Sequence, residues 1–164
     1  MEPQLTVKKE PIGNGVFINV SKHHSFGTDA VLLSHFAKPK KADRLVDLGT
    51  GCGIIAFLIK RDFPDVKAAC VDISKEATEL CNMTVKDNDI KDFTVINSDL
   101  KQLKGRLDFG SNTLVTCNPP YMIDHHGLQN PMGPKAIARH EVLCNLEDVV
   151  RNASRVLKSS GHFY

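Results

Sequence analysis

Residues 44–63, RLVDLGTGCGIIAFLIKRDF, place a strand, a glycine-rich turn and a helix in direct succession. The first five residues form a short, largely apolar run that is typical of a buried strand. Glycines at positions 49, 51 and 53 permit a tight turn. The apolar run that follows is long enough for a helix, which must end before Pro64. This order of elements predicts the first half of a β–α–β unit, whose helix leads back to a parallel strand.

The same alternation continues on both sides of this stretch. Further strands are expected at 15–20, 67–73, 93–96, 113–117 and 162–164, the first of them as half of a hairpin turned at Gly13 and Asn14. Further helices are expected at 28–37, 75–85 and 146–157, with N-caps at Thr28, Ser74 and Asn145, and Gly161 should end the last unit. This alternation predicts a doubly wound α/β fold with a mainly parallel sheet.

The composition is that of one soluble globular domain. The chain has 164 residues, of which 41% are hydrophobic and 24% charged, and no apolar run is long enough for a membrane span. Its five cysteines are odd in number, lie mostly in apolar runs and form no C-x-x-C pair, which favours reduced thiols in a cytoplasmic protein over disulfides or zinc. The net charge of +2 permits a nucleic-acid partner without arguing for one.

In doubly wound sheets, ligands bind beyond the carboxyl ends of the strands. After the first core strand, Asp47 precedes a G-x-G-x-G turn formed by Gly49, Gly51 and Gly53. The nicotinamide fingerprint is G-x-G-x-x-G, so this spacing differs from it. An acidic residue at the strand end suits a ligand with a cationic amino group better than a pyrophosphate. The pattern therefore favours S-adenosyl-L-methionine as the cofactor, although a glycine-rich turn without a ligand is an equally simple interpretation.

Acidic residues also follow the next two strands. Asp72, in VDIS with Ile73, lies 19 positions after Gly53, close to the distance at which an acidic residue reaches ribose hydroxyls in dinucleotide folds. Asp99, in NSDL with Leu100, could accept from an adenine amino group while Leu100 donates its backbone N–H. The alternatives are that Asp72 begins a turn before Ser74 and that Asp99 caps the next turn.

The fourth core strand ends in NPPY, residues 118–121. The amide oxygen of Asn118 and the carbonyl of Pro119 are two acceptors at a fixed separation, because proline at the next position restricts the backbone. They can hold the two hydrogens of an exocyclic NH₂ group, and Tyr121 offers a face for the ring that carries it. A strand that simply ends in Asn-Pro is the alternative. The motif predicts a site for a planar amine.

The chain resembles the class I S-adenosylmethionine-dependent methyltransferases that act on planar amino nitrogens. Within them it is most similar to the bacterial tRNA (adenine-N6)-methyltransferases that modify the adenine beside the anticodon of one valine tRNA. The matching segments occur in the family order from about residue 23 to the C-terminus. They are HHSFGTDAVLLSHFA (23–37), RLVDLGTGCGIIAFLI (44–59), VDIS (71–74), NSDL (97–100), NPPYM (118–122) and ARHE (138–141).

The resemblance implies roles for several further residues. It places Phe26, Thr28 and Asp29 over the methionine end of the cofactor, although Thr28 and Asp29 also suit an ordinary helix N-terminus. It places residues 139–141 (Arg139, His140 and Glu141) in a loop that closes over substrate, where solvated loop charge is the alternative. Six cations could contact tRNA phosphates or simply form a solvated surface: Lys8, Lys9, Lys38, Lys40, Lys41 and Arg44.

The expected reaction is direct in-line methyl transfer, for which the protein mainly positions and desolvates the reactants. No covalent nucleophile is needed, and Cys117 is interpreted as a buried strand residue. The adjacent pairs His23–His24 and His125–His126 point apart in an extended chain, so no metal site is expected.

The resemblance also suggests a division into residues 1–42, a hairpin and a cofactor-covering helix, and residues 43–164, the cofactor-binding core. Family members continue beyond this length, so we expect a Rossmann-like sheet that is truncated after its fifth strand. A cut sheet would expose an edge through which the chain could self-associate.

Three other functions remain open. The same chemistry could serve an rRNA amino group or a glutamine side chain of a protein. A truncated chain could instead bind cofactor or RNA without catalysis. A nicotinamide-dependent oxidoreductase is the third, which the glycine spacing disfavours.

Overall fold

The computed structural model describes residues 6–40, 43–119 and 145–164. The strands of this part are β1 (Lys8–Gly13), β2 (Val16–Val20), β3 (Arg44–Leu48), β4 (Lys67–Asp72), β5 (Phe93–Asn97), β6 (Asn112–Cys117) and β7 (Leu157–Phe163). Its helices are α1 (Thr28–Phe36), α2 (Ile54–Asp62), α3 (Lys75–Asp87), α5 (Leu146–Val156) and a 3₁₀ turn, η1 (Leu100–Gln102).

The central sheet has the order β5-β4-β3-β6-β7, and every neighbouring pair in it is parallel. From β3 the chain first builds outward through β4 to β5, and then returns to place β6 on the other side of β3. Val46 of β3 lies opposite Val115 of β6, and Leu48 opposite Cys117. The direction of winding therefore reverses between β3 and β6, where open α/β sheets bind ligands. The predicted doubly wound α/β fold is confirmed.

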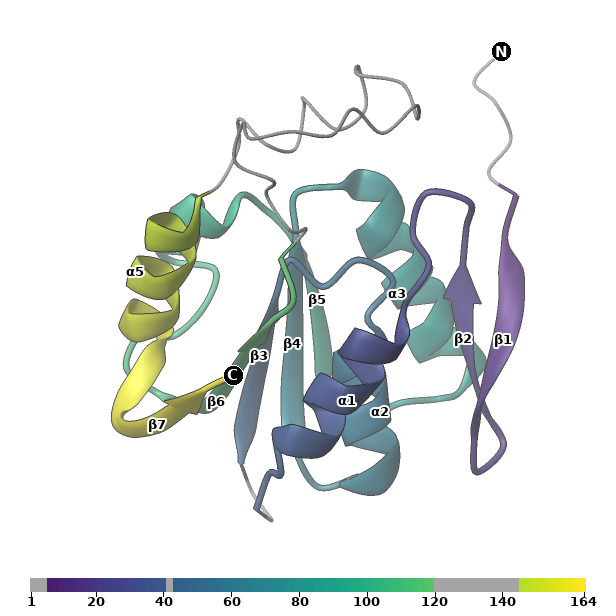
Figure 1. The fold of residues 1–164 in the computed structure, drawn as a ribbon, viewed down its shortest axis with the longest axis horizontal. Helices are drawn as coiled ribbons and strands as arrows, with labels where there is room; N and C mark the ends of the chain where they lie inside the picture. The colour runs from purple at the N-terminus through teal and green to yellow at the C-terminus, as the bar shows by residue number, and fades with distance from the viewer. Residues whose placement is uncertain (1–5, 41–42, 120–144) are drawn as a thin grey trace, which may run out of the picture.

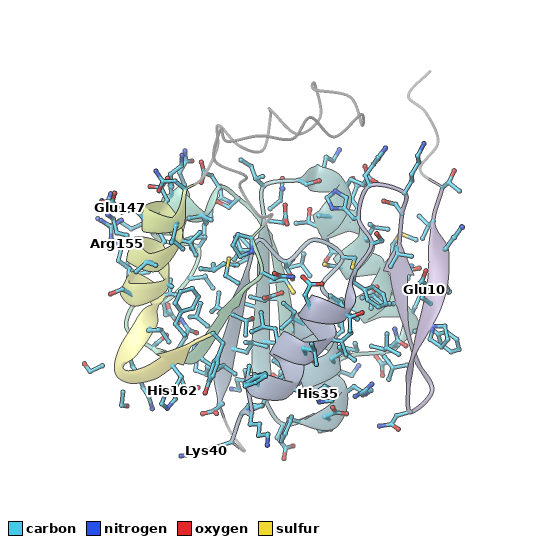
Figure 2. All side chains as sticks on the ribbon, viewed as in Figure 1. Glu10, His35, Lys40, Glu147, Arg155 and His162 are labelled. Atoms are coloured by element: carbon cyan, nitrogen blue, oxygen red, sulfur yellow. The ribbon has the colours of Figure 1, made fainter. Side chains whose placement is uncertain are left out.

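Helices cover both faces of this sheet, as Figure 1 shows, with α1, α2 and α3 on one side and α5 on the other. The first face packs against a cluster centred on α2, whose Phe57 is completely buried and stacks on Phe93 with 4.6 Å between ring centroids. The second face packs through Val149, Ala153 and Val156 of α5. Figure 2 shows Glu147 and Arg155 of α5 pointing away from the sheet, as expected for an amphipathic helix.

The predicted hairpin before the core is also confirmed. Strands β1 and β2 pair antiparallel, and the turn is formed by Asn14 and Gly15, one residue later than expected. Both have positive φ, 53° and 75°, as a tight two-residue hairpin turn requires. The hairpin packs on α3, where the backbone N–H of Asn19 donates to Thr84 Oγ1 at 2.9 Å.

Two of the three predicted helix caps are confirmed. Ser74 accepts from the backbone N–H of Ala77 at the start of α3, and Asn145 forms a capping box with Asp148 at the start of α5. The expected cap at Thr28 is wrong. Gly27 is the N-cap of α1, in an extended conformation, and Thr28 is already helical. Thr28 is exposed, and no side chain caps this end of the helix.

The chain leaves α5 earlier than its apolar pattern predicts. Leu157 already begins β7, and Gly161 lies inside that strand. The predictions that Leu157 is helical and that Gly161 ends the unit are therefore wrong. The register of β6 and β7 shifts between Asn112 and Leu114, and this irregularity absorbs the extra residues before the expected strand at 162–164 pairs. None of the helices in the described ranges is long and apolar enough to cross a membrane.

Candidate functional site

The turn between β3 and α2, residues 49–53, is called the glycine loop below. Gly49, Gly51 and Gly53 all have positive φ, at 64°, 56° and 84°, which favours glycine at each position. A Cβ at Gly53 would lie 2.5 Å from the Phe57 ring, so this glycine also permits close packing of the loop on α2. A Cβ at Gly49 or Gly51 would meet no atom within 4 Å, so there is open space beside the loop.

Asp47, at the end of β3, is completely buried. Its two carboxylate oxygens accept hydrogen bonds from the hydroxyls of Thr116, at 2.6 Å, and Thr50, at 2.5 Å. The carboxylate therefore joins β3 to β6 and to the glycine loop. Sequence reasoning expected it to face a cationic ligand, and did not identify either threonine as its partner. In this structure Asp47 instead anchors the glycine loop, through Thr50, to strands β3 and β6.

Burial raises the pKa of Asp47 from its ordinary 3.8 to about 6, although the hydrogen bonds from Thr116 and Thr50 lower it. The folded protein thus keeps a proton on Asp47 at pH values where the unfolded chain has already lost it. The stability that this proton provides is lost as pH rises from about 4 to about 6, so ionised Asp47 destabilises the fold at neutral pH.

The variant Asp47→Asn tests this assignment, because an amide cannot ionise. We compare the free energy of unfolding of the variant with that of the wild type at each pH. The difference in favour of the variant should be larger at pH 7.5 than at pH 4, by up to about 3 kcal/mol. Denaturant unfolding of both proteins at both pH values measures this difference, and Asp108→Asn controls for removal of an exposed carboxylate. An equal difference in unfolding free energy at both pH values would show that Asp47 does not titrate as described.

Asp72 ends β4 with its carboxylate half-buried beside the glycine loop. One oxygen accepts from the backbone N–H of Gly51 and the other from that of Ser74, both at 2.8 Å. A carboxylate has about four acceptor positions, so two remain for a ligand. The next residue, Ile73, is 41% exposed.

Asp99 follows β5 and begins the turn η1. Its side chain accepts from the backbone N–H of Lys101 at 2.8 Å and therefore caps this turn, as the simpler interpretation predicted. Leu100 is the first residue of η1 and is half-buried. The capping contact uses one of the acceptor positions of Asp99 and leaves its expected role toward adenine as a prediction.

Asn118 follows β6, which is the neighbour of β3 at the point where the winding reverses. Its side-chain Nδ2 donates to Asp29 Oδ2 at 2.7 Å. Asp29 lies in the first turn of α1 and is exposed, whereas Asn118 is half-buried and Pro119 exposed. Phe26, just before α1, is partly buried against the core. The sequence indicated both Asp29 and Asn118 as site residues but did not predict the hydrogen bond between them.

Several predicted residues cannot be compared with the structure. Tyr121, the segment 139–141 and Lys41 lie outside the described residues. Of the described cations, Lys9 pairs with Asp87 at 2.9 Å, and Arg44 lies 3.4 Å from Asp108 at the amino end of β3. Figure 2 places Lys40 near that same end of the sheet, away from the carboxyl ends.

The thiols agree with the sequence interpretation. Cysteines 52, 70, 81 and 117 are buried thiols, and the described cysteines form no disulfide. Burial raises the pKa of Cys52 to about 12, which keeps it protonated and unreactive. Within the described ranges, no three histidine, cysteine or acidic side chains are grouped closely enough to hold a metal ion.

Comparison with known proteins shows that this chain is similar to methyltransferases. The sequence model of the methyltransferase small domain family matches residues 13–164. The tRNA1(Val) (adenine(37)-N6)-methyltransferase of Bacteroides thetaiotaomicron is 30% identical over 139 residues, which cover 84% of this chain and 56% of that protein. The ribosomal RNA small subunit methyltransferase C of Shewanella sediminis is 35% identical over 100 residues, 61% of this chain and 26% of that protein.

Among solved structures, precorrin-6y C5,15-methyltransferase of Geobacter metallireducens shares the fold. Its TM-score is 0.63 at 12% identity, over 89% of this chain and 66% of that one. The chain spans little more than half the length of the tRNA methyltransferase that it resembles.

Proposed function

Because this chain belongs to the methyltransferase small domain family, we propose that it is an S-adenosyl-L-methionine-dependent N-methyltransferase acting on the exocyclic N6 of an adenine in tRNA. The observation that carries the proposal is the position of Asn118 and Pro119. They lie at the end of β6, directly beside β3 and its glycine loop. Acceptors for an amino group and a loop suited to a cofactor are thus neighbours at the switch point of the sheet.

The residues present fit this cofactor. Open space borders Gly49 and Gly51, and Asp72 keeps two acceptor positions that suit ribose hydroxyls. We assign to the cofactor the glycine loop and residues near the strand ends: Phe26, Thr28, Gly49, Gly51, Gly53, Asp72, Ile73, Asp99 and Leu100. Buried Asp47 supports the loop through Thr50 and does not contact the cofactor itself. When bound, S-adenosyl-L-methionine supplies an electrophilic methyl group.

The protein's part in the reaction is to orient the amine and exclude water. The amide oxygen of Asn118 and the carbonyl of Pro119 accept the two N–H hydrogens, which turns the nitrogen lone pair away from the ring and toward the cofactor. Tyr121 stacks on the base, which must be swung out of a folded RNA to reach it. Cys117 is buried and serves as a strand residue, not as a nucleophile.

The substrate assignment is supported by the relatives. The similar protein from Bacteroides is named for adenine 37 of tRNA1(Val), so an adenine beside the anticodon is the first candidate. The similar protein from Shewanella is named for small-subunit rRNA, which makes an rRNA amino group the second. Either RNA fits the cytoplasmic location inferred from the cysteines. We also propose that the hairpin and α1, within residues 1–42, cover the cofactor held by residues 43–164.

The substrate is tested by transfer of a labelled methyl group from S-adenosyl-L-methionine by the full chain. Unmodified bulk tRNA, small-subunit rRNA and a release-factor glutamine peptide are compared as acceptors. We expect label in tRNA; label only in the peptide would contradict an RNA substrate. Titration with S-adenosylhomocysteine and with NADH separates the alternatives further, because an oxidoreductase would bind NADH.

The edge of the sheet at β7 gives a prediction about assembly. Within the described part of the chain, β7 pairs only with β6, and Phe163 and Tyr164 are 39% and 40% exposed. An open edge with apolar side chains favours pairing between chains, so we expect the 164-residue chain to self-associate. Light scattering over a concentration series should show Phe163→Lys shifted toward monomer. Phe63→Lys, at a similarly exposed residue just after α2, should be unchanged. A wild-type monomer at high concentration would contradict this prediction.

A further inference from the structure

We propose that Asp29 is a positioning residue that fixes the orientation of the Asn118 side-chain amide, and so selects a nucleophile that carries N–H hydrogens. This inference rests on the proposed function and deepens it. It gives Asp29 a role toward the substrate amine, through Asn118, in place of the contact with the methionine end of the cofactor that the resemblance implies.

The contact itself determines the orientation. Asn118 Nδ2 lies 2.7 Å from Asp29 Oδ2. A carboxylate can only accept hydrogen bonds, so the branch of the amide that faces it must be the NH₂ group. The amide oxygen Oδ1 is then on the branch that faces away from Asp29. The orientation follows from the chemistry of the partner, even though oxygen and nitrogen of an amide have nearly the same shape.

The absence of a side chain at Gly27 leaves room for the Asp29 carboxylate in this position. Its other oxygen, Oδ1, lies only 2.5 Å from the position of a Cβ at Gly27, so any larger residue there would displace the carboxylate. The hydrogen bond from Asn118 lowers the pKa of Asp29 below its ordinary 3.8, and the backbone N–H of Ala30 acts in the same direction. Asp29 is therefore ionised at neutral pH, where a carboxylate is acceptor-only.

The consequence is a choice between substrate classes. With Oδ1 presented, the site offers an acceptor and attracts an amino group. With the amide reversed, it would present an NH₂ group, which suits a carbonyl or another acceptor and repels an amine. Asp29 and Asn118 are 89 positions apart in the sequence, so α1 determines the amide orientation of a residue that directly follows β6.

The test compares Asp29→Ala, Asn118→Ala and the double variant in the full chain. In single-turnover transfer to tRNA, we expect Asp29→Ala to be slower by about tenfold to a hundredfold, the equivalent of one charge-assisted hydrogen bond. The affinity for S-adenosylhomocysteine should change less than about twofold. Because both residues act through one amide, the double variant should be no slower than Asn118→Ala.

Three further variants sharpen the comparison. Asp29→Asn keeps an acceptor and should retain an intermediate rate. Gly27→Ala should slow transfer less than Asp29→Ala does, because its Cβ shifts the carboxylate while Asp29 is still present. Asp108→Ala removes an exposed carboxylate at the amino end of β3 and should leave the rate unchanged.

An NMR readout separates this inference from the proposed function. The side-chain NH₂ protons of Asn118 should exchange faster with water in Asp29→Ala than in wild type or Asp108→Ala, with or without activity. Unchanged exchange, additive rate losses in the double variant, or a loss of cofactor affinity that accounts for the rate would each overturn the role of Asp29. No transfer to RNA by wild type, with the exchange difference present, would refute the proposed function but leave the amide contact supported.

Discussion

The variant Asn118→Ala is expected to lower the rate constant of methyl transfer by ~10²–10³, with little change in cofactor affinity. The substitution removes one of the two acceptors that we propose hold the substrate amine in a fixed orientation. Losses of this size are typical when one preorganised group is removed from a site that excludes water. The other acceptor, the Pro119 carbonyl, belongs to the backbone and is retained. This result would indicate that Asn118 acts mainly in the transition state of the reaction.

Single-turnover transfer to tRNA measures this rate constant, and calorimetry with S-adenosylhomocysteine measures the affinity in parallel. Asn82→Ala is a matched control, since Asn82 is exposed on α3, away from the strand ends. A wild-type rate in Asn118→Ala would exclude the proposed acceptor. A loss confined to cofactor affinity would instead make Asn118 a cofactor ligand only.

Asp72→Ala is expected to weaken S-adenosyl-L-methionine binding by about tenfold to a hundredfold. The variant loses the charged acceptor that we propose for the ribose hydroxyls. It also loses the hydrogen bonds that join Asp72 to the N–H groups of Gly51 and Ser74, so part of the effect will come from a less ordered glycine loop.

Calorimetry separates these two contributions when Asp72→Asn is included. The Asn side chain keeps one acceptor oxygen and a shape similar to that of Asp. The affinity of Asp72→Asn for S-adenosyl-L-methionine should therefore lie between that of Asp72→Ala and that of wild type. Asp108→Ala, again at the opposite end of the sheet, should bind as wild type does. An unchanged dissociation constant in Asp72→Ala, with the protein still folded in thermal unfolding, would remove Asp72 from the cofactor site.

Local patterns predicted most of the fold because the elements depend on local chemistry. The run at 44–63 specifies its strand, turn and helix through apolar residues and glycines, and Ser74 and Asn145 cap helices by contacts within four residues. The wrong predictions occur where tertiary contacts determine the secondary structure of a residue. Leu157 continues the apolar stripe of α5, but pairing with Asn112 of β6 places it in β7.

Candidate site residues could be proposed from the sequence, but their contacts could not be predicted. Glycines, acidic residues and NPPY follow successive strands, and parallel strands bring their carboxyl ends to one edge. A sequence does not show that Asp47 faces inward to Thr116, 69 positions away, or that Asp29 reaches Asn118. Both contacts join segments that become neighbours only when α1 and β6 take their places around β3.

The central claim, that two acceptors at the end of β6 present an exocyclic amino group for methylation, is tested most directly by nucleoside analysis. Transfer RNA methylated by the full chain is digested to nucleosides, and the labelled nucleoside is identified by mass spectrometry. The account predicts N6-methyladenosine, absent from the same reaction with Asn118→Ala. Label on a ring nitrogen or on a ribose oxygen would contradict it, because neither atom carries the NH₂ group that Asn118 and Pro119 are proposed to hold.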